Sequence, residues 1–232
     1  MENGFKLLLS CPSGLSSSQV SVNFDESYDR VPHPDIDLEK SISEVHYILP
    51  FADDCKQCQH TSSPLGNGAI VETSDNKILV LQRSNNVGEF PGYLVFPGGH
   101  PEPEEVGISS HKCQKGLQNS ELINSKVSQE MFDSIVREVV EEIGVPAATL
   151  SEPLFIGISR RVLNVRPAAF FFIKCNLEST EVQQVYSSAQ DSYESTKLYT
   201  IEPSELEKMA SKMPGCHRGG YALYKLMLGA GK

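Results

Sequence analysis

The sequence predicts an α/β or α+β domain in which helices pack on a mixed β-sheet. Short apolar strands separated by turns recur through most of the chain, one long amphipathic helix interrupts them, and no internal repeat is apparent. The chain has 232 residues, and 39% of them are hydrophobic, which is enough to bury a core. This length suits one domain with an appended subdomain, or two small domains.

The first part of the chain is irregular. Two short strands are predicted at Phe5–Ser10 and Gln19–Phe24, on either side of a turn at residues 11–14. Ser41–Glu44 has the pattern of a capped helix start, but no helical pattern follows it. We therefore expect residues 1–63 to form a small, incomplete, β-containing N-terminal subdomain with its linker.

A regular pattern of strands and helices covers residues 64–232, the second predicted domain. Ala168–Cys175 is nearly all apolar, so we expect it to be a central strand. The other predicted strands are Ala69–Thr73, Lys77–Gln82, Tyr93–Phe96, Leu154–Ser159 and Lys197–Thr200. Shorter helices are predicted at Glu181–Ala189, Pro203–Met213 and Tyr221–Leu228.

The clearest helix is predicted over Gln129–Ile143. Ser128 is a suitable N-cap, and Gly144 followed by Pro146 ends the helical pattern. One face carries apolar residues at helical spacing, namely Phe132, Ile135, Val136, Val139, Val140 and Ile143. We expect this stripe to pack on the sheet.

Three carboxylates share the opposite face of this helix. Glu138 is three residues before Glu141 and four before Glu142, so the three side chains are neighbours and repel one another. Arg137 can offset part of this repulsion through its i,i+4 spacing to Glu141. A divalent cation would remove it, since hard oxygen ligands suit Mg²⁺ or Mn²⁺. The helix therefore predicts a metal site.

The net charge of the chain is −10, and half of it lies in residues 101–145. The ordinary interpretation of such a run is a solvated helix face, which we keep for Glu121 and Glu130. An acidic balance argues against nucleic-acid binding by a basic surface. An acidic protein can still bind a phosphate-rich substrate when a divalent cation lies between the protein and the substrate.

Cysteine usage and hydropathy favour an intracellular, cytoplasmic protein. The six cysteines are too dispersed for a disulfide framework, and Met1–Leu9 lacks the basic start of a secretory signal. No apolar run approaches the roughly 20 residues that cross a bilayer, so we expect no membrane partner. Cys55, Cys58 and His60 resemble half of a zinc site, and a zinc-binding interaction protein is one alternative hypothesis. The oligomeric state stays open.

The long helix resembles the second half of a Nudix box. Arg137–Val145 matches the pattern R-E-U-x-E-E-x-G-U, with U apolar, at every fixed position. Upstream, Gly99 is followed six residues later by Glu105, which matches the first half, G-x5-E. Glu102 and Glu104 compete with Glu105 for this place.

The two halves of the box are separated by additional residues. The pattern has seven residues between its first glutamate and the arginine, whereas 31 residues separate Glu105 from Arg137 here. Residues 103–127 lack clear periodicity, as is typical of a functional or mobile connection. We therefore expect an inserted loop at about residues 106–127.

The resemblance extends to the Nudix UDP-sugar hydrolases and their plant relatives. It is carried by Leu7–Leu15, Gly66–Ser84, Phe96–Pro103, Tyr193–Thr196 and the C-terminal helix. It implies an α/β/α sandwich around a mixed sheet and Mg²⁺-dependent cleavage of UDP-glucose or UDP-galactose to UMP and hexose 1-phosphate. Members of the subgroup carry a further segment after the helix start at Ser41–Glu44. This chain lacks that segment, so a Nudix-fold nucleotide-binding module with little or no catalysis is the second hypothesis.

The candidate metal ligands are the helix carboxylates Glu138, Glu142 and Glu141. By resemblance to other Nudix enzymes, the Gly98 carbonyl is a further ligand and Glu194 is an additional catalytic acid. Arg137 is expected to orient the carboxylates.

Candidates for substrate binding come from glycines and arginines. Gly98 and Gly99 let the backbone approach a ligand closely. Arg83, at the end of a predicted strand, and Arg218, in a glycine-rich turn, are candidate phosphate contacts. Two neighbouring arginines, Arg160 and Arg161, are expected to lie in a solvated loop. His100, which directly follows the two glycines, is expected to have a structural role.

Overall fold

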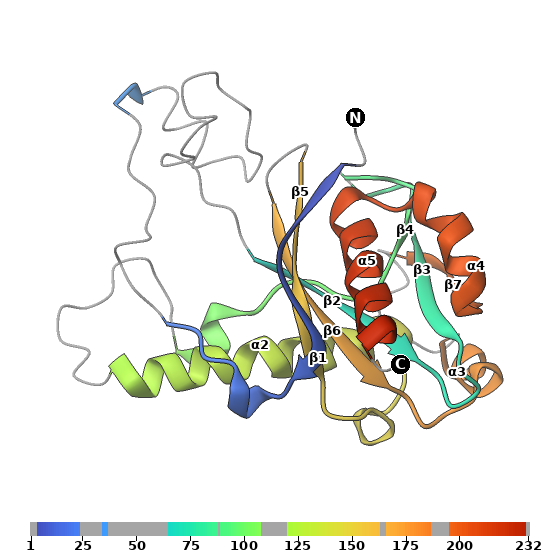
Figure 1. Ribbon diagram of the computed structural model, residues 1–232, viewed down its shortest axis with the longest axis horizontal. Helices are drawn as coiled ribbons and strands as arrows, with labels where there is room; N and C mark the ends of the chain where they lie inside the picture. Colours follow the sequence, from blue (N-terminus) through green and yellow to red (C-terminus); the bar gives the residue numbers. More distant parts are fainter. Residues whose placement is uncertain are drawn as a thin grey trace.

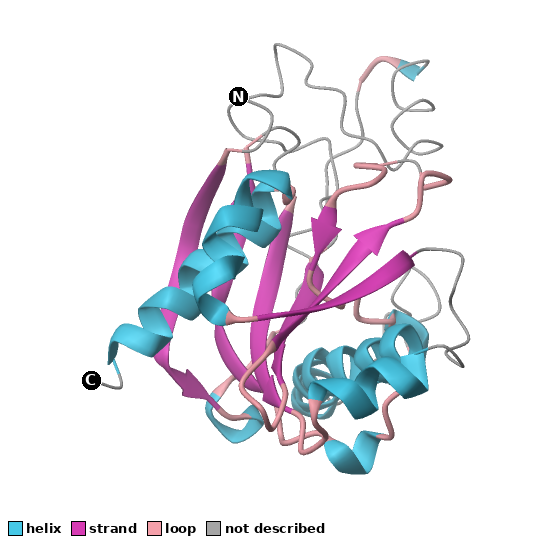
Figure 2. Cartoon of the chain, turned by 90° about the vertical axis from the view of Figure 1, so that its right-hand side faces the viewer, coloured by secondary structure: helices cyan, strands magenta, loops and turns pink. Residues whose placement is uncertain are grey.

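The computed structural model describes residues 4–23, 34–36, 65–87, 89–107, 120–162, 166–186 and 195–230. Helices cover both faces of one seven-stranded sheet (Figures 1 and 2), which confirms the predicted α/β class with a mixed sheet. Within these ranges, no helix combines the length and the apolar character needed to cross a bilayer.

The strands follow the order β1-β5-β6-β2-β3-β4, and β7 pairs with β3. β2 and β6 run parallel and the other pairs run antiparallel. Because β6 pairs with both β5 and β2, its predicted central position is confirmed. The strand bounds are β1 (Phe5–Leu15), β2 (Gly66–Glu72), β3 (Ile78–Arg83), β4 (Leu94–Val95), β5 (Leu154–Arg161), β6 (Pro167–Lys174) and β7 (Ser195–Ile201).

Two hydrophobic cores lie on the two faces of the sheet. Alternate residues of β2 point to opposite faces, so Ala69 and Val71 join one core and Ile70 joins the other. The first core contains Phe132, Ile135, Val139 and Ile143 of α2 (Ser120–Ile143) and Val182 of α3 (Ser179–Tyr186), whereas Val136 and Val140 of the predicted stripe are only partly buried. The second core contains residues of α4 (Pro203–Met209) and α5 (Gly215–Ala230). The result is the expected α/β/α sandwich (Figure 1).

The N-terminal strands differ from their prediction. β1 continues through the expected turn at residues 11–14, with a register shift against β5 between Ser10 and Leu15. A short 3-10 helix, Ser17–Gln19, follows it, and Val20–Asn23 forms no strand, so the predicted strand at Gln19–Phe24 is wrong over its described part. Pairing with β5 extends β1 through a segment that its local turn residues predicted to bend.

The division into a subdomain at 1–63 and a domain at 64–232 stays a prediction, since residues 37–64 lie outside the described part of the chain. In the part that is described, β1 forms the edge of the main sheet. The helix start at Ser41–Glu44 and the zinc candidates Cys55, Cys58 and His60 also lie outside the described residues.

Two helices begin six or more residues earlier than predicted. α2 begins at Ser120, so the last part of the expected loop at 106–127 is helical. Ser128 is an interior residue of α2 rather than its N-cap, and its hydroxyl donates to the Asn124 carbonyl at 2.7 Å. This bond to the preceding turn gives the serine a partner inside a helix. α5 begins at Gly215 instead of Tyr221, so the expected glycine-rich turn is its first turn and a half.

Candidate functional site

A turn of two glycines follows β4 and lies against β2. The Ala69 amide donates to the Pro97 carbonyl at 2.8 Å, and the Asn67 amide donates to the Gly99 carbonyl at 2.9 Å. The Asn67 side chain returns a bond, because its Oδ1 accepts from the Gly99 amide at 2.7 Å. Gly98 has a φ of 153°, and a Cβ there would overlap the Asn67 carbonyl. Only glycine fits this position without displacing β2.

The carboxylates of Glu138 and Glu142 face this turn from α2. Glu142 Oε2 accepts from the Gly98 amide at 2.8 Å, and Glu138 Oε1 accepts from the His100 amide at 3.3 Å. A Cβ on Gly99 would overlap the Glu138 carboxylate. Both glutamates are half-buried, whereas Glu141 is exposed. The i,i+4 pair therefore points at the glycine turn, whereas the helical spacing predicted only that the two carboxylates share one helix face.

Arg137 is held by a glutamate that the sequence assigned to solvent. Its Nη2 donates to Glu130 Oε1 at 2.6 Å, and Glu130 is only 7% exposed. The same oxygen accepts from the Glu102 amide at 2.9 Å. The hydrogen bond with Glu130 raises the pKa of Arg137. The prediction of a solvated Glu130 is therefore wrong, since its carboxylate is paired and buried.

Three acids compete for the first glutamate of the box. Glu104 and Glu105 lie in the short 3-10 helix Pro103–Val106, and Glu102 directly precedes it. Glu102 and Glu105 contribute smaller electrostatic effects to the raised pKa of Arg137, so this segment lies near the arginine. The direct partner of Arg137 is nevertheless Glu130, on the same helix and about two turns away.

The metal site stays a prediction. Among the residues that the structure describes, no group of three or more His, Cys, Asp or Glu side chains is arranged to hold a metal ion. Glu138 and Glu142 accept instead from backbone amides, which stabilise a carboxylate. Their chemistry nevertheless fits a hard divalent cation, because carboxylate oxygens are the ligands that Mg²⁺ prefers.

The candidate substrate-binding arginines lie on other elements. Arg83 ends β3, and its Nε donates to the Glu89 carbonyl at 3.0 Å. Arg218 lies in the first turn of α5, where its amide donates to the Pro214 carbonyl at 3.0 Å. Their roles with phosphate stay predictions. Glu194 lies outside the described residues.

Arg161 differs most from its prediction. It is the last residue of β5 and only 8% exposed, so a solvated loop is wrong for it. Its Nη1 donates to Glu89 Oε2 at 3.1 Å, and its guanidinium lies 4.5 Å from the centre of the Phe90 ring. The available signal was its position two residues after the predicted apolar strand Leu154–Ser159.

The sequence did not single out His217, which connects α5 to the residue that follows β4. Its Nδ1 accepts from the Phe96 amide at 3.1 Å, and its ring centre lies 5.8 Å from that of Phe170. Burial lowers the pKa of His217 to about 3, with smaller contributions from the charges of Arg161 and Arg83. The ring is therefore neutral at physiological pH, and its proton is on Nε2.

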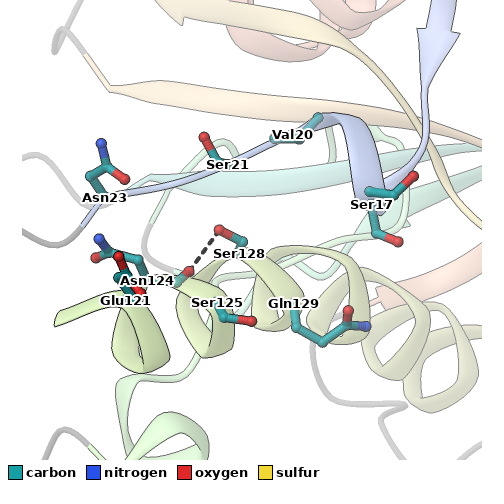
Figure 3. A pocket seen from close by; sticks show the side chains of 10 residues that line it. Ser17, Val20, Ser21, Asn23, Glu121, Asn124, Ser125, Ser128 and Gln129 are labelled. Carbon is teal, nitrogen blue, oxygen red and sulfur yellow. Dashed lines mark hydrogen bonds between the residues drawn. The ribbon is translucent and has the colours of Figure 1, made fainter. Parts of the chain in front are cut away.

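A separate hollow of about 570 Å³ lies between the segment after β1 and the N-terminal half of α2 (Figure 3). Its lining is mostly serine and amide side chains, and Glu121 is its single charged residue. None of the candidate site residues lines it.

Comparison with known proteins places the chain in a family. It is 50% identical to Nudix hydrolase 9 of Arabidopsis thaliana over 283 residues, which cover 97% of this chain and 91% of the relative. It is 35% identical to the human protein uridine diphosphate glucose pyrophosphatase NUDT22 over 153 residues, which cover 65% of this chain and 48% of that relative. That match therefore spans about half of the human protein.

Solved structures are less similar. A Nudix hydrolase from Nitrosomonas europaea has a TM-score of 0.44 at 17% identity, with 74% of this chain and 91% of that chain covered. A C. elegans Ap4A hydrolase has a TM-score of 0.44 at 16% identity, with 72% and 99% covered. No protein-family model matches the chain.

The fold is an α/β/α sandwich that presents a glycine turn to an acidic helix. The chain belongs to the Nudix hydrolases, since it is 50% identical to the Arabidopsis member over an alignment that covers nearly the whole of both proteins. The 97% of this chain that is matched is about 225 residues. A span of 283 residues therefore includes roughly 58 residues of the relative that have no counterpart here, whereas the expected position of a missing segment after Ser41–Glu44 stays a prediction.

Proposed function

We propose that this protein hydrolyses the pyrophosphate bond of a nucleoside diphosphate sugar, with UDP-glucose and UDP-galactose as the favoured substrates. The observation that carries the proposal is the pair Glu138 and Glu142, whose carboxylates face a two-glycine turn in a Nudix chain. The name of the human relative supports both the nucleotide and the sugar.

In this reaction the oxygen of a water molecule forms a bond to one phosphorus, and the bond from that phosphorus to the bridging oxygen breaks. The products are UMP and hexose 1-phosphate, and the protons of the water pass to the leaving phosphate and to solvent. A bound Mg²⁺ or Mn²⁺ ion supplies positive charge at the phosphoryl oxygens and lowers the pKa of water.

The chain's own residues bind and position the reactants. Glu138 and Glu142 would hold the ion, with the exposed Glu141 as a third carboxylate from the same face. The turn of Gly98 brings backbone groups to the substrate without a side chain between them. Arg137, paired with Glu130, fixes the part of α2 that carries the carboxylates. Glu194 is the proposed further acid.

A substrate screen with matched variants tests this proposal. The purified chain is incubated with UDP-, ADP- and GDP-sugars and Mg²⁺, and the products are identified. We expect UMP and hexose 1-phosphate from UDP-sugars, and a loss of about 100-fold or more in kcat for Glu138→Gln and Glu142→Gln. Glu121→Gln, an exposed change on the same helix, is the control. Full activity in both site variants would contradict the assignment.

A nucleotide-binding module with little or no catalysis is the second candidate function. It is favoured by the roughly 58 residues of the Arabidopsis relative that have no counterpart here. Titration calorimetry separates the two candidates, since binding of UDP-glucose with no product after hours would support the module.

A further inference from the structure

A cluster of three arginines lies where β5 ends and β6 begins. Arg161 Nη1 donates to Glu89 Oε2 at 3.1 Å, and Arg166 Nη1 lies 3.6 Å from Glu89 Oε1. Arg83 Nε donates to the backbone carbonyl of the same glutamate at 3.0 Å. Three positive charges therefore surround a residue that carries one negative charge. We call these three residues around Glu89 the arginine cluster.

The buried member of the cluster has donor capacity to spare. The Arg161 side chain is 10% exposed, and its Nη2 contacts Cys216 Sγ at 3.5 Å. Its Nε is buried and has no hydrogen-bond partner among the residues that the structure describes, and the same holds for Nε of the neighbouring Arg160. A buried donor without a partner is costly, so such donors need an explanation. The contact of Arg161 with Glu89 does not use this Nε donor, so a tether to Glu89 explains only part of the arrangement.

The start of α5 adds to the positive potential at the cluster. Cys216, which contacts Arg161, lies in the first turn of this 16-residue helix. The N-terminal end of a helix carries partial positive charge and favours anions. The adjacent His217 is neutral, because burial lowers its pKa to about 3, so the ring adds no positive charge of its own.

The cluster lies at the same end of the sheet as the glycine turn. The Phe96 amide, two residues before Gly98, donates to His217, whose pKa is lowered in part by Arg161 and Arg83. At the start of β2, a Cβ on Gly66 would lie 3.6 Å from the Gly99 carbonyl oxygen and 3.7 Å from the Pro167 carbonyl oxygen. β6, which begins at Pro167, therefore starts beside the glycine turn, and Arg166 directly precedes it.

We propose that the arginine cluster binds a phosphate group of the nucleotide-sugar substrate and so positions its pyrophosphate for the carboxylates of α2. This proposal rests on the proposed function and extends it to a second anion-binding element. Guanidinium groups suit the role because their planar donors pair with two oxygens of one phosphate. In this assignment Arg161 and Arg166 bind substrate, and Glu89 positions the two guanidiniums.

Titration of the full chain with the two products, UMP and glucose 1-phosphate, tests the cluster without turnover. EDTA is present, so that a metal ion makes no contribution. We expect Arg166→Gln to weaken binding of at least one product by about 10-fold or more, and Arg166→Lys to recover part of the loss. Lys174→Gln, which removes an exposed charge from the other end of β6, is the matched control and should change binding less than about 2-fold. Unchanged affinity for both products in Arg166→Gln would overturn the proposal.

Kinetics separate failure of this proposal from failure of the proposed function. With UDP-glucose and Mg²⁺, Arg166→Gln should raise KM about 10- to 100-fold and change kcat less. An unchanged KM in an active protein overturns the cluster and leaves the function intact. If the wild-type chain hydrolyses no nucleotide sugar, the proposed function fails, and the titrations still decide whether the cluster binds phosphate. Arg161→Gln is the second variant, with its melting temperature measured to verify that it folds.

Discussion

Arg137 Nη2 lies 2.6 Å from Glu130 Oε1, seven residues earlier on the same helix. Glu130 also accepts from the amide of Glu102, so one buried carboxylate joins the acidic helix to the chain that follows the glycine turn. The two halves of the site are far apart in sequence, and this contact fixes one against the other. The sequence spacing favoured Glu141 as the partner of Arg137, whereas its hydrogen-bond partner in the structure is Glu130.

Removing the charge of Glu130 should therefore destabilise the protein. We expect Glu130→Gln to lower the free energy of unfolding by about 1–3 kcal/mol, since a buried ionic hydrogen bond is lost. Urea denaturation measures the change. Glu121→Gln, on the exposed part of α2, should stay within about 0.5 kcal/mol of wild type. Equal stability of the two variants would mean that the pair with Arg137 contributes nothing.

A methyl group on Gly99 should affect activity more than stability. Its Cβ would overlap the Glu138 carboxylate, a side chain that can move aside at modest cost. We expect Gly99→Ala to lower kcat for UDP-glucose by about 10-fold or more, because a displaced carboxylate no longer faces the turn. Gly229→Ala, with open space around its Cβ, is the control. If Gly99→Ala is as active as this control, the position of Glu138 is not critical.

Gly98 should respond in the opposite way. Its φ of 153° disfavours any side chain, and its Cβ would overlap the backbone of β2 rather than a movable side chain. We expect Gly98→Ala to lower the free energy of unfolding by about 1–3 kcal/mol, as measured by urea denaturation. A free energy of unfolding equal to that of wild type would contradict the close packing of the turn on Asn67.

His217 should make the fold sensitive to acid. Its pKa is about 3 in the folded chain and near the ordinary value of 6.5 when unfolded, so the unfolded state binds the extra proton. The stability that the neutral ring contributes is complete above about pH 6.5 and is lost as the pH falls toward 3. We expect a loss of about 1.4 kcal/mol per pH unit in this window.

His217→Asn is the control for this effect, since its amide oxygen can still accept from Phe96 but does not titrate. The free energy of unfolding, measured by urea denaturation between pH 7 and pH 4, should fall more steeply with decreasing pH in the wild type than in this variant. The same pH dependence in both proteins would show that the ring is not held neutral.

Chelation should remove activity without unfolding the chain. Glu138 and Glu142 accept backbone hydrogen bonds from the glycine turn, so their charges have partners without a metal ion. We expect EDTA to abolish hydrolysis of UDP-glucose, Mg²⁺ to restore it, and the melting temperature to change by less than about 3 °C. A large fall in melting temperature on chelation would instead indicate a structural metal.

The sequence by itself determined the features that depend on local periodicity. The spacing of Glu138 and Glu142 places both on one helix face, whatever the rest of the chain does. The apolar stripe of α2 and the apolar β6 predicted a core on a mixed sheet, and four of the six stripe residues and residues 168–173 of β6 are buried. The motif around Arg137 predicted the family, which the Arabidopsis relative confirms.

Only the tertiary structure decided which distant residues meet. Glu130 and Arg161 read as solvated charges in the sequence, yet they are buried because Glu102 and Glu89, from other segments, lie against them. Ser128, the expected N-cap of α2, likewise has a distant partner, because its hydroxyl accepts from the Val22 amide at 2.7 Å from a position inside the helix. Local spacing fixes the face of an element, whereas the partner of a buried charge depends on packing between segments that the sequence keeps apart.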